Sequence, residues 1–398
     1  MPSKLHQDSP KWRSVILCGD EDYLESVRSY RSGGHHPVHI NDRLDGARYR
    51  VLHKFGYGGS STVWLCQDNI YRTPTYVAIK ILIALRNEAN CRELHMAQHL
   101  RALGVDKQPG AHLLCFPLRD FRQTGPNGTH ICIVYPVLGP PLDLARETFE
   151  DHFNQDDCAR IVRGLVYEIV GKPETVKVVV KDLSGEHVLC PDIPQYLVHS
   201  IDFIEPHHLS GQISITDFGE SFNHCTEGER LTGIPRAYCA PELVFDKKGG
   251  LAADLWALGC LAFEARTGKK MIWPADLLGP NDREYLMHVI LLLGRLPDKW
   301  WDTVENRDAI IVRSDGGTHS RLELRMEKWG NPEEERSIDA KIRASCYRNT
   351  QLDRNIKILD ISEAEVEVMS KLLEQLLQYE PEKRLAAQDA VNHEWFRM

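Results

Sequence analysis

Hydrophobic and polar positions alternate with a period of two in the first third of the chain. Short β-rich runs bounded by turn residues cover 49–55, 62–67, 76–82, 115–122 and 130–135. Between the third and fourth runs, residues 87–103 have a helical pattern, with Leu94, Ala97 and Leu100 on one face. The turn Gly125-Pro126-Asn127-Gly128 joins the last two runs. The pattern predicts a small antiparallel sheet of five strands with one helix.

The pattern changes after Gly139-Pro140-Pro141, where helical periodicity replaces alternation. It is clearest over 251–267, 283–293 and 363–378, whereas 314–360 is charged, weakly patterned and predicted to form surface loops and short helices. Residues 1–48 are polar and interrupted by glycine and proline, and are predicted to extend from the core. We therefore expect an α+β protein with an N-terminal extension (1–48), a β-rich lobe (49–138) and a larger, mainly helical lobe (139–398).

Composition narrows the function classes. The net charge is −9, so no concentrated basic face for nucleic acid is expected, and an acidic chain would rather attract a basic protein. The 11 cysteines form no C-x-x-C pair, and several, such as Cys66, Cys132 and Cys260, lie in apolar runs typical of buried reduced thiols. The N-terminus has no signal-peptide pattern and no run is apolar enough to span a membrane, so we expect an intracellular protein without a membrane partner.

A glycine-rich turn joins the first two strands, within Phe55-Gly56-Tyr57-Gly58-Gly59-Ser60-Ser61-Thr62-Val63. Glycines such as Gly56 and Gly58 let backbone N–H groups approach phosphate oxygens that a Cβ would exclude, and Ser61 is small enough to allow the same approach. On its own such a turn is more often a simple tight hairpin. The phosphate interpretation therefore depends on additional motifs later in the chain.

Lys80 ends the apolar strand Val77-Ala78-Ile79-Lys80, about 20 residues after the turn. A lysine there can reach the α- and β-phosphates of ATP, although a strand-end lysine can also simply extend its ammonium group to solvent. An acidic partner would hold it in place. We prefer Glu93 to Glu88, because the core-facing residues of the predicted helix follow Glu93 directly.

Further motifs occur in a fixed order. Asp217 in Thr216-Asp217-Phe218-Gly219 comes after a strand and is predicted to coordinate Mg²⁺ bridging the β- and γ-phosphates. Ala240-Pro241-Glu242 ends the next segment, with Arg384 predicted as the buried ion-pair partner of Glu242. Residues 254–259 have the form of a central helix. Taken together, these motifs predict phosphoryl transfer from ATP.

The sequence resembles a eukaryotic protein kinase over residues 49–397 and, more narrowly, the SR-protein kinases of the CMGC group, particularly their fungal members. The residues that carry this resemblance are 30–38, 61–65 and 137–140. The resemblance implies a bilobal protein-kinase fold, ATP and Mg²⁺ as cofactors, and phosphorylation of serine in arginine/serine-rich splicing factors. It also implies residence in the cytoplasm and nucleus, and we expect a monomer.

The same resemblance implies an adenine site. Tyr135 would be the gatekeeper, the carbonyl of Pro136 and the N–H of Leu138 would bind the adenine edge, and the ring would lie between Val63, Ala78 and Leu189. Related kinases often have glutamate in place of Pro136. Proline removes only an N–H that adenine does not use, so ATP binding should survive.

The segment 178–189 occupies the place of the kinase catalytic loop. Asp182 would accept or orient the proton of the substrate hydroxyl, whereas Val180 and Ser184 replace the usual histidine and lysine. His187 stands where an asparagine normally binds a second Mg²⁺, and imidazole is a poor ligand for that ion. Losing one such contact costs ~10²–10³ in rate. Cys239 replaces an arginine that helps to shape the substrate-binding loop.

Three functions are compatible with these residues. The first is a serine/threonine kinase acting on arginine/serine-rich proteins, and the second is a pseudokinase, favoured by the altered residues around Asp182. The third is a small-molecule phosphotransferase of kinase-like fold, which would normally lack the motifs at 240–242 and 254–259. Other features have simpler interpretations: His35-His36 as loop residues, Trp300-Trp301 as packing, and 190–210 as an insert without an assigned role.

Overall fold

The computed structural model describes residues 12–18, 24–85, 91–139, 173–182, 184–201, 213–227, 233–272, 282–303, 337–348, 356–357 and 359–398. The chain divides into two compact units, Met1–Ser221 and Phe222–Met398. This division lies further along the chain than the lobe boundary expected at 138/139, which stays a prediction. We describe the two units separately.

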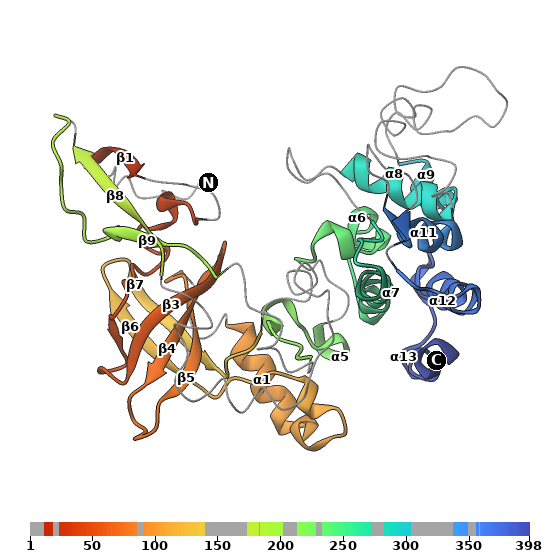
Figure 1. Ribbon diagram of the computed structural model, residues 1–398, viewed down its shortest axis with the longest axis horizontal. Coiled ribbons are helices and arrows are strands. Elements are labelled where there is room, and N and C mark those ends of the chain that lie inside the picture. The colour runs from red at the N-terminus through yellow and green to blue at the C-terminus, as the bar shows by residue number, and fades with distance from the viewer. Residues whose placement is uncertain are drawn as a thin grey trace. The chain divides into compact units, whose positions relative to one another are not determined.

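The first unit contains a six-stranded sheet with strand order β2-β3-β4-β5-β7-β6, in which all neighbours are antiparallel (Figure 1). All five predicted strands are present, and the two-residue β2 extends one edge. The turn at 125–128 closes the last hairpin, where Gly125 pairs with Gly128. The strands are β2 (Arg43–Leu44), β3 (Tyr49–Gly58), β4 (Ser61–Asp68), β5 (Thr75–Leu82), β6 (Arg119–Gly125) and β7 (Gly128–Tyr135).

Alternation along β5 separates two hydrophobic layers. Val77, Ile79 and Ile81 pack on one face of the sheet, while Ala78 and Leu82 pack on the other. This second layer also contains Cys91 and Leu94, from the start of helix α1 (Arg92–Ala102), and α1 lies beside the sheet in Figure 1. Because side chains two residues apart share a face, Lys80 lies on the α1 side.

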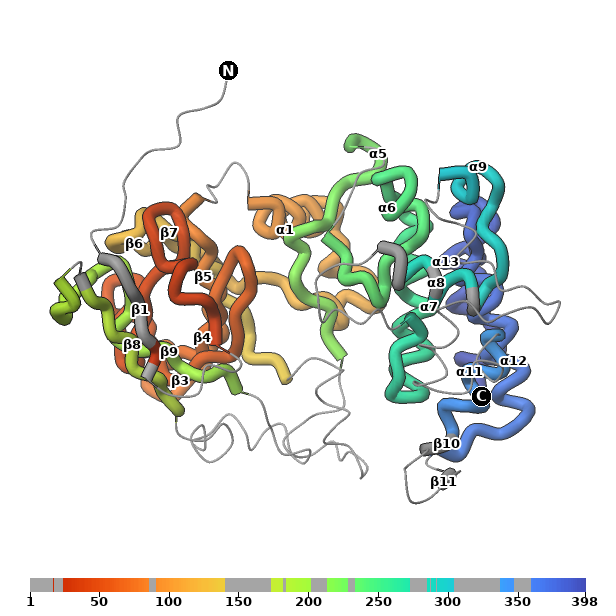
Figure 2. The backbone as a smooth tube through the Cα atoms, turned by 90° about the horizontal axis from the view of Figure 1, so that it is seen from above, coloured from red at the N-terminus to blue at the C-terminus, as the bar shows by residue number. Residues whose placement is uncertain are grey.

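A second sheet in the same unit joins distant parts of the chain. It contains β1 (Trp12–Cys18), β8 (Thr175–Asp182) and β9 (Tyr196–Val198), paired antiparallel in the order β1-β8-β9. Strands β8 and β9 are labelled next to each other in Figure 2. Val178, Val180 and Leu197 form a buried cluster with Val27 and Tyr30. Described residues of the N-terminal segment, such as Val27 and Tyr30, therefore contribute to the core, where an extension was expected. Strand β1 contains the short apolar run Val15-Ile16-Leu17-Cys18, which was not predicted to form an element, and strand β9 lies within the insert left unassigned.

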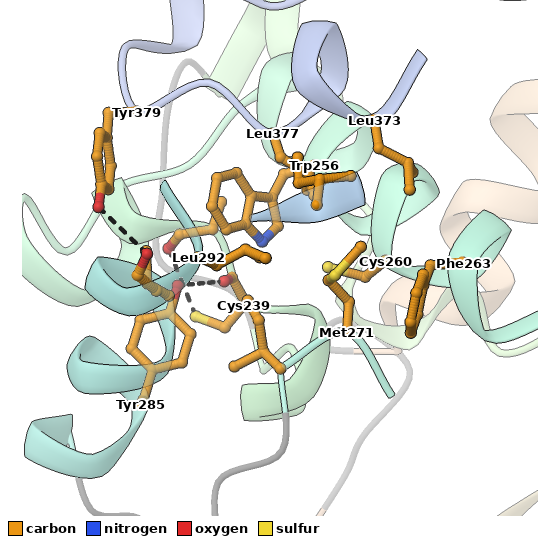
Figure 3. Close-up of a cluster of buried hydrophobic side chains, with 14 of the residues drawn as sticks. Cys239, Trp256, Cys260, Phe263, Met271, Tyr285, Leu292, Leu373, Leu377 and Tyr379 are labelled. Atoms are coloured by element: carbon orange, nitrogen blue, oxygen red, sulfur yellow. Dashed lines mark hydrogen bonds between the residues drawn. The ribbon is translucent and has the colours of Figure 1, made fainter. Parts of the chain in front are cut away.

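The second unit is mainly helical, as predicted. In its core, Trp256 and Cys260 from α7 (Leu251–Thr267) pack with Tyr285 from α8 (Asp282–Leu293) and Leu373 from α12 (Glu363–Leu376), as Figure 3 shows. Helix α7 has the predicted bounds, and the tryptophan pair at 300–301 is buried as expected. The helices are α5 (His224–Glu227), α6 (Pro241–Phe245), α7 (Leu251–Thr267), α8 (Asp282–Leu293), α9 (Asp298–Trp301), α11 (Ile338–Ser345), α12 (Glu363–Leu376) and α13 (Ala387–Ala390).

Short elements complete the description. Strands β10 (Tyr347–Arg348) and β11 (Ile356–Lys357) pair antiparallel. Single 3₁₀ turns lie at Val27–Ser29, Val105–Lys107, Ala111–Leu113, Phe218–Glu220, Arg236–Tyr238, Pro381–Lys383 and Glu394–Arg397. Within the described ranges, no helix is both long and apolar enough to cross a membrane.

Candidate active site

Lys80 bridges two carboxylates in the first unit. Its Nζ donates to Glu93 Oε2 and to Asp217 Oδ1, each at 2.8 Å. Burial lowers the pKa of Lys80, but the charges of the two carboxylates and the hydrogen bonds to them outweigh this effect, so its pKa lies above the ordinary value. Lys80 is therefore a fixed cation on the α1 face of the sheet, and can bind an anionic group.

Glu93 lies in the first turn of α1, where a negative charge is favoured by the helix dipole. Its side chain is almost completely buried, so its charge needs partners. Of the two glutamates considered for Lys80, Glu93 is within hydrogen-bond distance, and Glu88 lies outside the described residues. Leu94 and Ala97 anchor the helix below it as buried residues, and Leu100 is half-buried.

Asp217 is held by its backbone. The preceding Ile215 exchanges backbone hydrogen bonds with Leu113 (2.6 Å) and Cys115 (2.9 Å). Asp217 itself has φ = 64°, a left-handed conformation that is sparsely populated by residues other than glycine, and a 3₁₀ turn follows it at once. This unusual geometry directs its carboxylate to Lys80.

The residues present are compatible with bound Mg²⁺. The Asp217 side chain is 71% exposed and can accept a cation as well as the Lys80 hydrogen bond. In the part of the chain that the structure describes, no group of three or more histidine, cysteine, aspartate or glutamate residues is arranged to hold a metal. Magnesium is commonly held by one or two carboxylates together with substrate phosphates and water. Asp217 would therefore share the ion with phosphate oxygens.

The glycine-rich turn has open space beside it. A Cβ atom at Gly56, Gly58 or Gly59 would have no atom within 4 Å apart from those of its chain neighbours. Gly58 pairs with Ser61 across the hairpin, and Ser61 is buried. The turn therefore leaves room on its glycine side for a phosphate group.

The residues predicted to contact adenine are partly brought together. Val63 and Leu138 pack against the hydrophobic layer that contains Ala78 and Tyr135, and Pro136 is half-buried beside them. Leu189 is 87% exposed and does not join this layer. The adenine-binding roles stay predictions.

The predicted catalytic segment forms a strand. Asp182 is the last residue of β8, and its backbone is paired with Trp12 of β1. After Asp182 the chain turns back, so that His187 forms an isolated antiparallel backbone bridge with Lys181. The side chain of His187 is exposed. The structure thus joins Lys80, Glu93 and Asp217 by hydrogen bonds, and places Asp182 through its backbone pairing. The catalytic role of Asp182 and the metal-binding role of His187 stay predictions.

The second unit contains the ion pair expected after the 240–242 motif. Arg384 donates to both carboxylate oxygens of Glu242, at 2.7 and 2.6 Å. The neighbouring Cys239 is buried, and its carbonyl accepts a 2.6 Å hydrogen bond from the hydroxyl of Tyr285 (Figure 3). At the position where the resemblance implies an arginine, the structure therefore has a buried thiol, and the backbone carbonyl of this residue is held by Tyr285.

The comparisons with known proteins identify the family. The protein kinase domain model matches residues 177–396, more than half of the chain. This chain belongs to the protein kinase domain family. Such a domain in general uses ATP with Mg²⁺ and acts on a protein substrate.

Its relatives include kinases named for SR proteins. Serine/threonine-protein kinase SRPK of Physarum polycephalum is 26% identical over 95% of this chain and 92% of its own length. Serine/threonine-protein kinase AFC1 of Arabidopsis thaliana is 27% identical over 98% of this chain and 76% of its own. Human SRSF protein kinase 3 is 34% identical over an alignment that covers 33% of this chain and 23% of the human protein. These names give no support to the pseudokinase alternative.

A solved kinase domain can be superposed on this chain with a TM-score of 0.48 and 16% sequence identity. The alignment covers 91% of this chain and 98% of the solved chain.

Proposed function

We propose that this chain is a serine/threonine protein kinase that transfers the γ-phosphate of ATP to serine in arginine/serine-rich proteins. The observation that carries the proposal is the Lys80 ammonium group, held 2.8 Å from both Glu93 and Asp217. A partly buried, doubly paired cation beside an open glycine-rich turn is an arrangement suited to nucleotide phosphates. The relatives named SRPK and SRSF protein kinase support the substrate class.

Each charged residue has one task in this proposal. Lys80 orients the phosphates, and Glu93 keeps Lys80 in place. Asp217 would hold Mg²⁺, which when bound would neutralise the charge that develops on the phosphates. Asp182 orients the hydroxyl of the substrate serine and accepts its proton. His187, as an imidazole, would contribute little to binding a second Mg²⁺, so turnover should be slow.

The charge of the chain agrees with a basic substrate. At a net charge of −9, the protein attracts arginine-rich segments at long range, an effect that salt weakens. The resemblance to SR-protein kinases is also the basis for proposing residence in both cytoplasm and nucleus.

The test of transfer is incorporation of radiolabelled phosphate into a peptide of alternating arginine and serine. The control peptides replace arginine by glutamate or serine by alanine. We expect incorporation with the first peptide alone, and a loss of at least ~10²-fold in Asp182→Asn and Asp217→Asn. Asp106→Asn, an exposed residue of the same unit, is the matched control and should retain activity. Absence of incorporation with both Mg²⁺ and Mn²⁺ would overturn the proposal.

Binding can be measured separately from transfer. ATP at 100 times its Kd should stabilise the chain by about 2.7 kcal/mol, seen as a rise in Tm. The rise should depend on Mg²⁺ in the wild type and lose that dependence in Asp217→Asn. Metal-dependent binding without any incorporation would leave a pseudokinase as the answer.

A further inference from the structure

Tyr135 contacts the side of Glu93 that Lys80 leaves free. Its hydroxyl donates to Glu93 Oε1 at 2.6 Å, whereas Lys80 Nζ donates to Oε2 at 2.8 Å. The two carboxylate oxygens therefore have different partners, on β7 and on β5. Both Tyr135 and Glu93 are buried, so neither bond is in competition with bulk water.

Strand geometry explains why tyrosine reaches this position. Ile131, Ile133 and Tyr135 alternate along β7 and belong to the hydrophobic layer on the α1 side. Tyr135 pairs with Ala78 across the β5–β7 ladder, two residues before Lys80 on the same face of β5. The ring continues the apolar layer, and only its hydroxyl extends to the carboxylate. Phenylalanine would fill the same space without that bond.

Lys80 and Tyr135 both bind Glu93, but they differ in their other interactions. Lys80 also binds Asp217, which is largely exposed, so its hydrogen bonds must rearrange when phosphates and a cation arrive. Tyr135 stays a donor throughout, because burial and the negative charge of Glu93 raise its pKa well above the ordinary value. Tyr135 can therefore donate to Glu93 whether Lys80 is bound to Asp217 or to another anion.

We propose that Tyr135 is a positioning residue whose hydroxyl anchors Glu93, and through it the first turn of α1, independently of Lys80. Lys80 can then turn from Asp217 to the nucleotide phosphates while Glu93 and the helix stay in place. The kinetic part of this inference rests on the proposed function, but the anchoring of α1 does not.

The decisive measurement is hydrogen exchange of the α1 amides in four chains without nucleotide: wild type, Tyr135→Phe, Lys80→Met and the double variant. A hydrogen bond to a buried carboxylate has a strength corresponding to about a tenfold or greater change in an opening equilibrium. We expect Tyr135→Phe to raise α1 exchange about tenfold both alone and in the Lys80→Met background, relative to amides of β4. A change below twofold, or one confined to the chain with Lys80, would overturn the proposal.

A matched control comes from the second unit. Tyr238 donates its hydroxyl to Glu264 Oε2, also at 2.6 Å. Tyr238→Phe removes a bond of the same type and length, and should leave the exchange of α1 unchanged. If it instead raised α1 exchange as much as Tyr135→Phe does, the effect would be general softening and the proposal would fail.

The ratio of the effects on kcat and on KM for ATP distinguishes a positioning role of Tyr135 from a purely structural one. Tyr135→Phe should lower kcat about tenfold while KM for ATP changes less than threefold, because nucleotide contacts remain and only the hold on Glu93 is weakened. Equal kcat in wild type and Tyr135→Phe would refute the catalytic consequence. A chain that shows no turnover at all would count against the proposed function, and the exchange experiment would still decide the anchoring.

Discussion

The buried ion pair between Glu242 and Arg384 allows a stability prediction worked from its contacts. Arg384 has a fully buried side chain, and Glu242 is 6% exposed. The guanidinium also donates to the carbonyls of Ala252 (2.7 Å) and Gln378 (2.9 Å), and lies over the ring of Trp256. It therefore ties α6, the start of α7 and the segment before 384 to one another.

The perturbation is Glu242→Gln. It keeps the side-chain shape but leaves the Arg384 cation buried without its counter-charge, and turns an amide N–H₂ towards guanidinium donors. Removing one partner of a buried pair costs about 3–5 kcal/mol. The matched control is Glu365→Gln. Glu365 also forms two hydrogen bonds with an arginine, Arg266, at 2.6 and 2.9 Å, but that pair is part-exposed and should cost at most ~1 kcal/mol.

The assay is urea unfolding of the full chain, followed by tryptophan fluorescence, because Trp256 lies beneath the guanidinium. If the urea midpoint falls no further for Glu242→Gln than for Glu365→Gln, the reasoning from burial is refuted. A double variant, Glu242→Leu with Arg384→Met, should unfold at higher urea than Glu242→Leu alone, since it removes the uncompensated charge. It should not reach the wild type, because the carbonyls of Ala252, Gln378 and Tyr379 lose their donor, at ~1–3 kcal/mol for each buried group left unpaired.

Three further predictions concern the first unit. Burial lowers the pKa of His36 from 6.5 to about 4, so the contribution of His36 to stability is complete above pH 6.5 and should fall by about 3 kcal/mol as pH drops towards 4; His36→Leu should reduce the pH dependence of the urea midpoint accordingly. Gly34→Ala would overlap a backbone carbonyl and lower Tm by several degrees, whereas Gly59→Ala, with open space around it, should not. Lys54 is fully buried and paired with Glu25, so Glu25→Gln should cost about 3–5 kcal/mol in chemical unfolding, and a cost near zero would contradict the pairing.

Alternation was sufficient to predict the part of the fold that carries Lys80. Val77, Ile79 and Ile81 face one layer, and this fixes Lys80 on the opposite face with Ala78. The short-range periodicity of α1 likewise places Glu93 and Leu94 towards that face. Side chains alternate between the two faces of a strand, and they return to the same face of a helix every three or four residues. A local pattern of hydrophobic residues therefore determines which face each side chain occupies.

The catalytic segment shows where motif recognition conflicts with propensity. Its position between motifs suggests a loop around Asp182, but Val178-Val179-Val180 is a run of β-branched residues that favours a strand. In the structure this run is β8, and its partner β1 lies more than 150 residues earlier in the chain. The local sequence could predict the strand, whereas no local signal could predict the partner.

Long-range partners also decide the features of the site that the sequence did not predict. Tyr135 and Glu93 are 42 residues apart, and Lys54 and Glu25 are 29 apart, yet each pair is buried and joined by a hydrogen bond. In each case one residue lies on a strand with a clear period, which predicts the face but not what that face meets. A buried charge needs a partner, so every charged residue predicted to face a core should prompt a search for one. Applied to Glu93, that rule calls for a donor to the carboxylate oxygen that Lys80 leaves free, and in the structure Tyr135 is that donor.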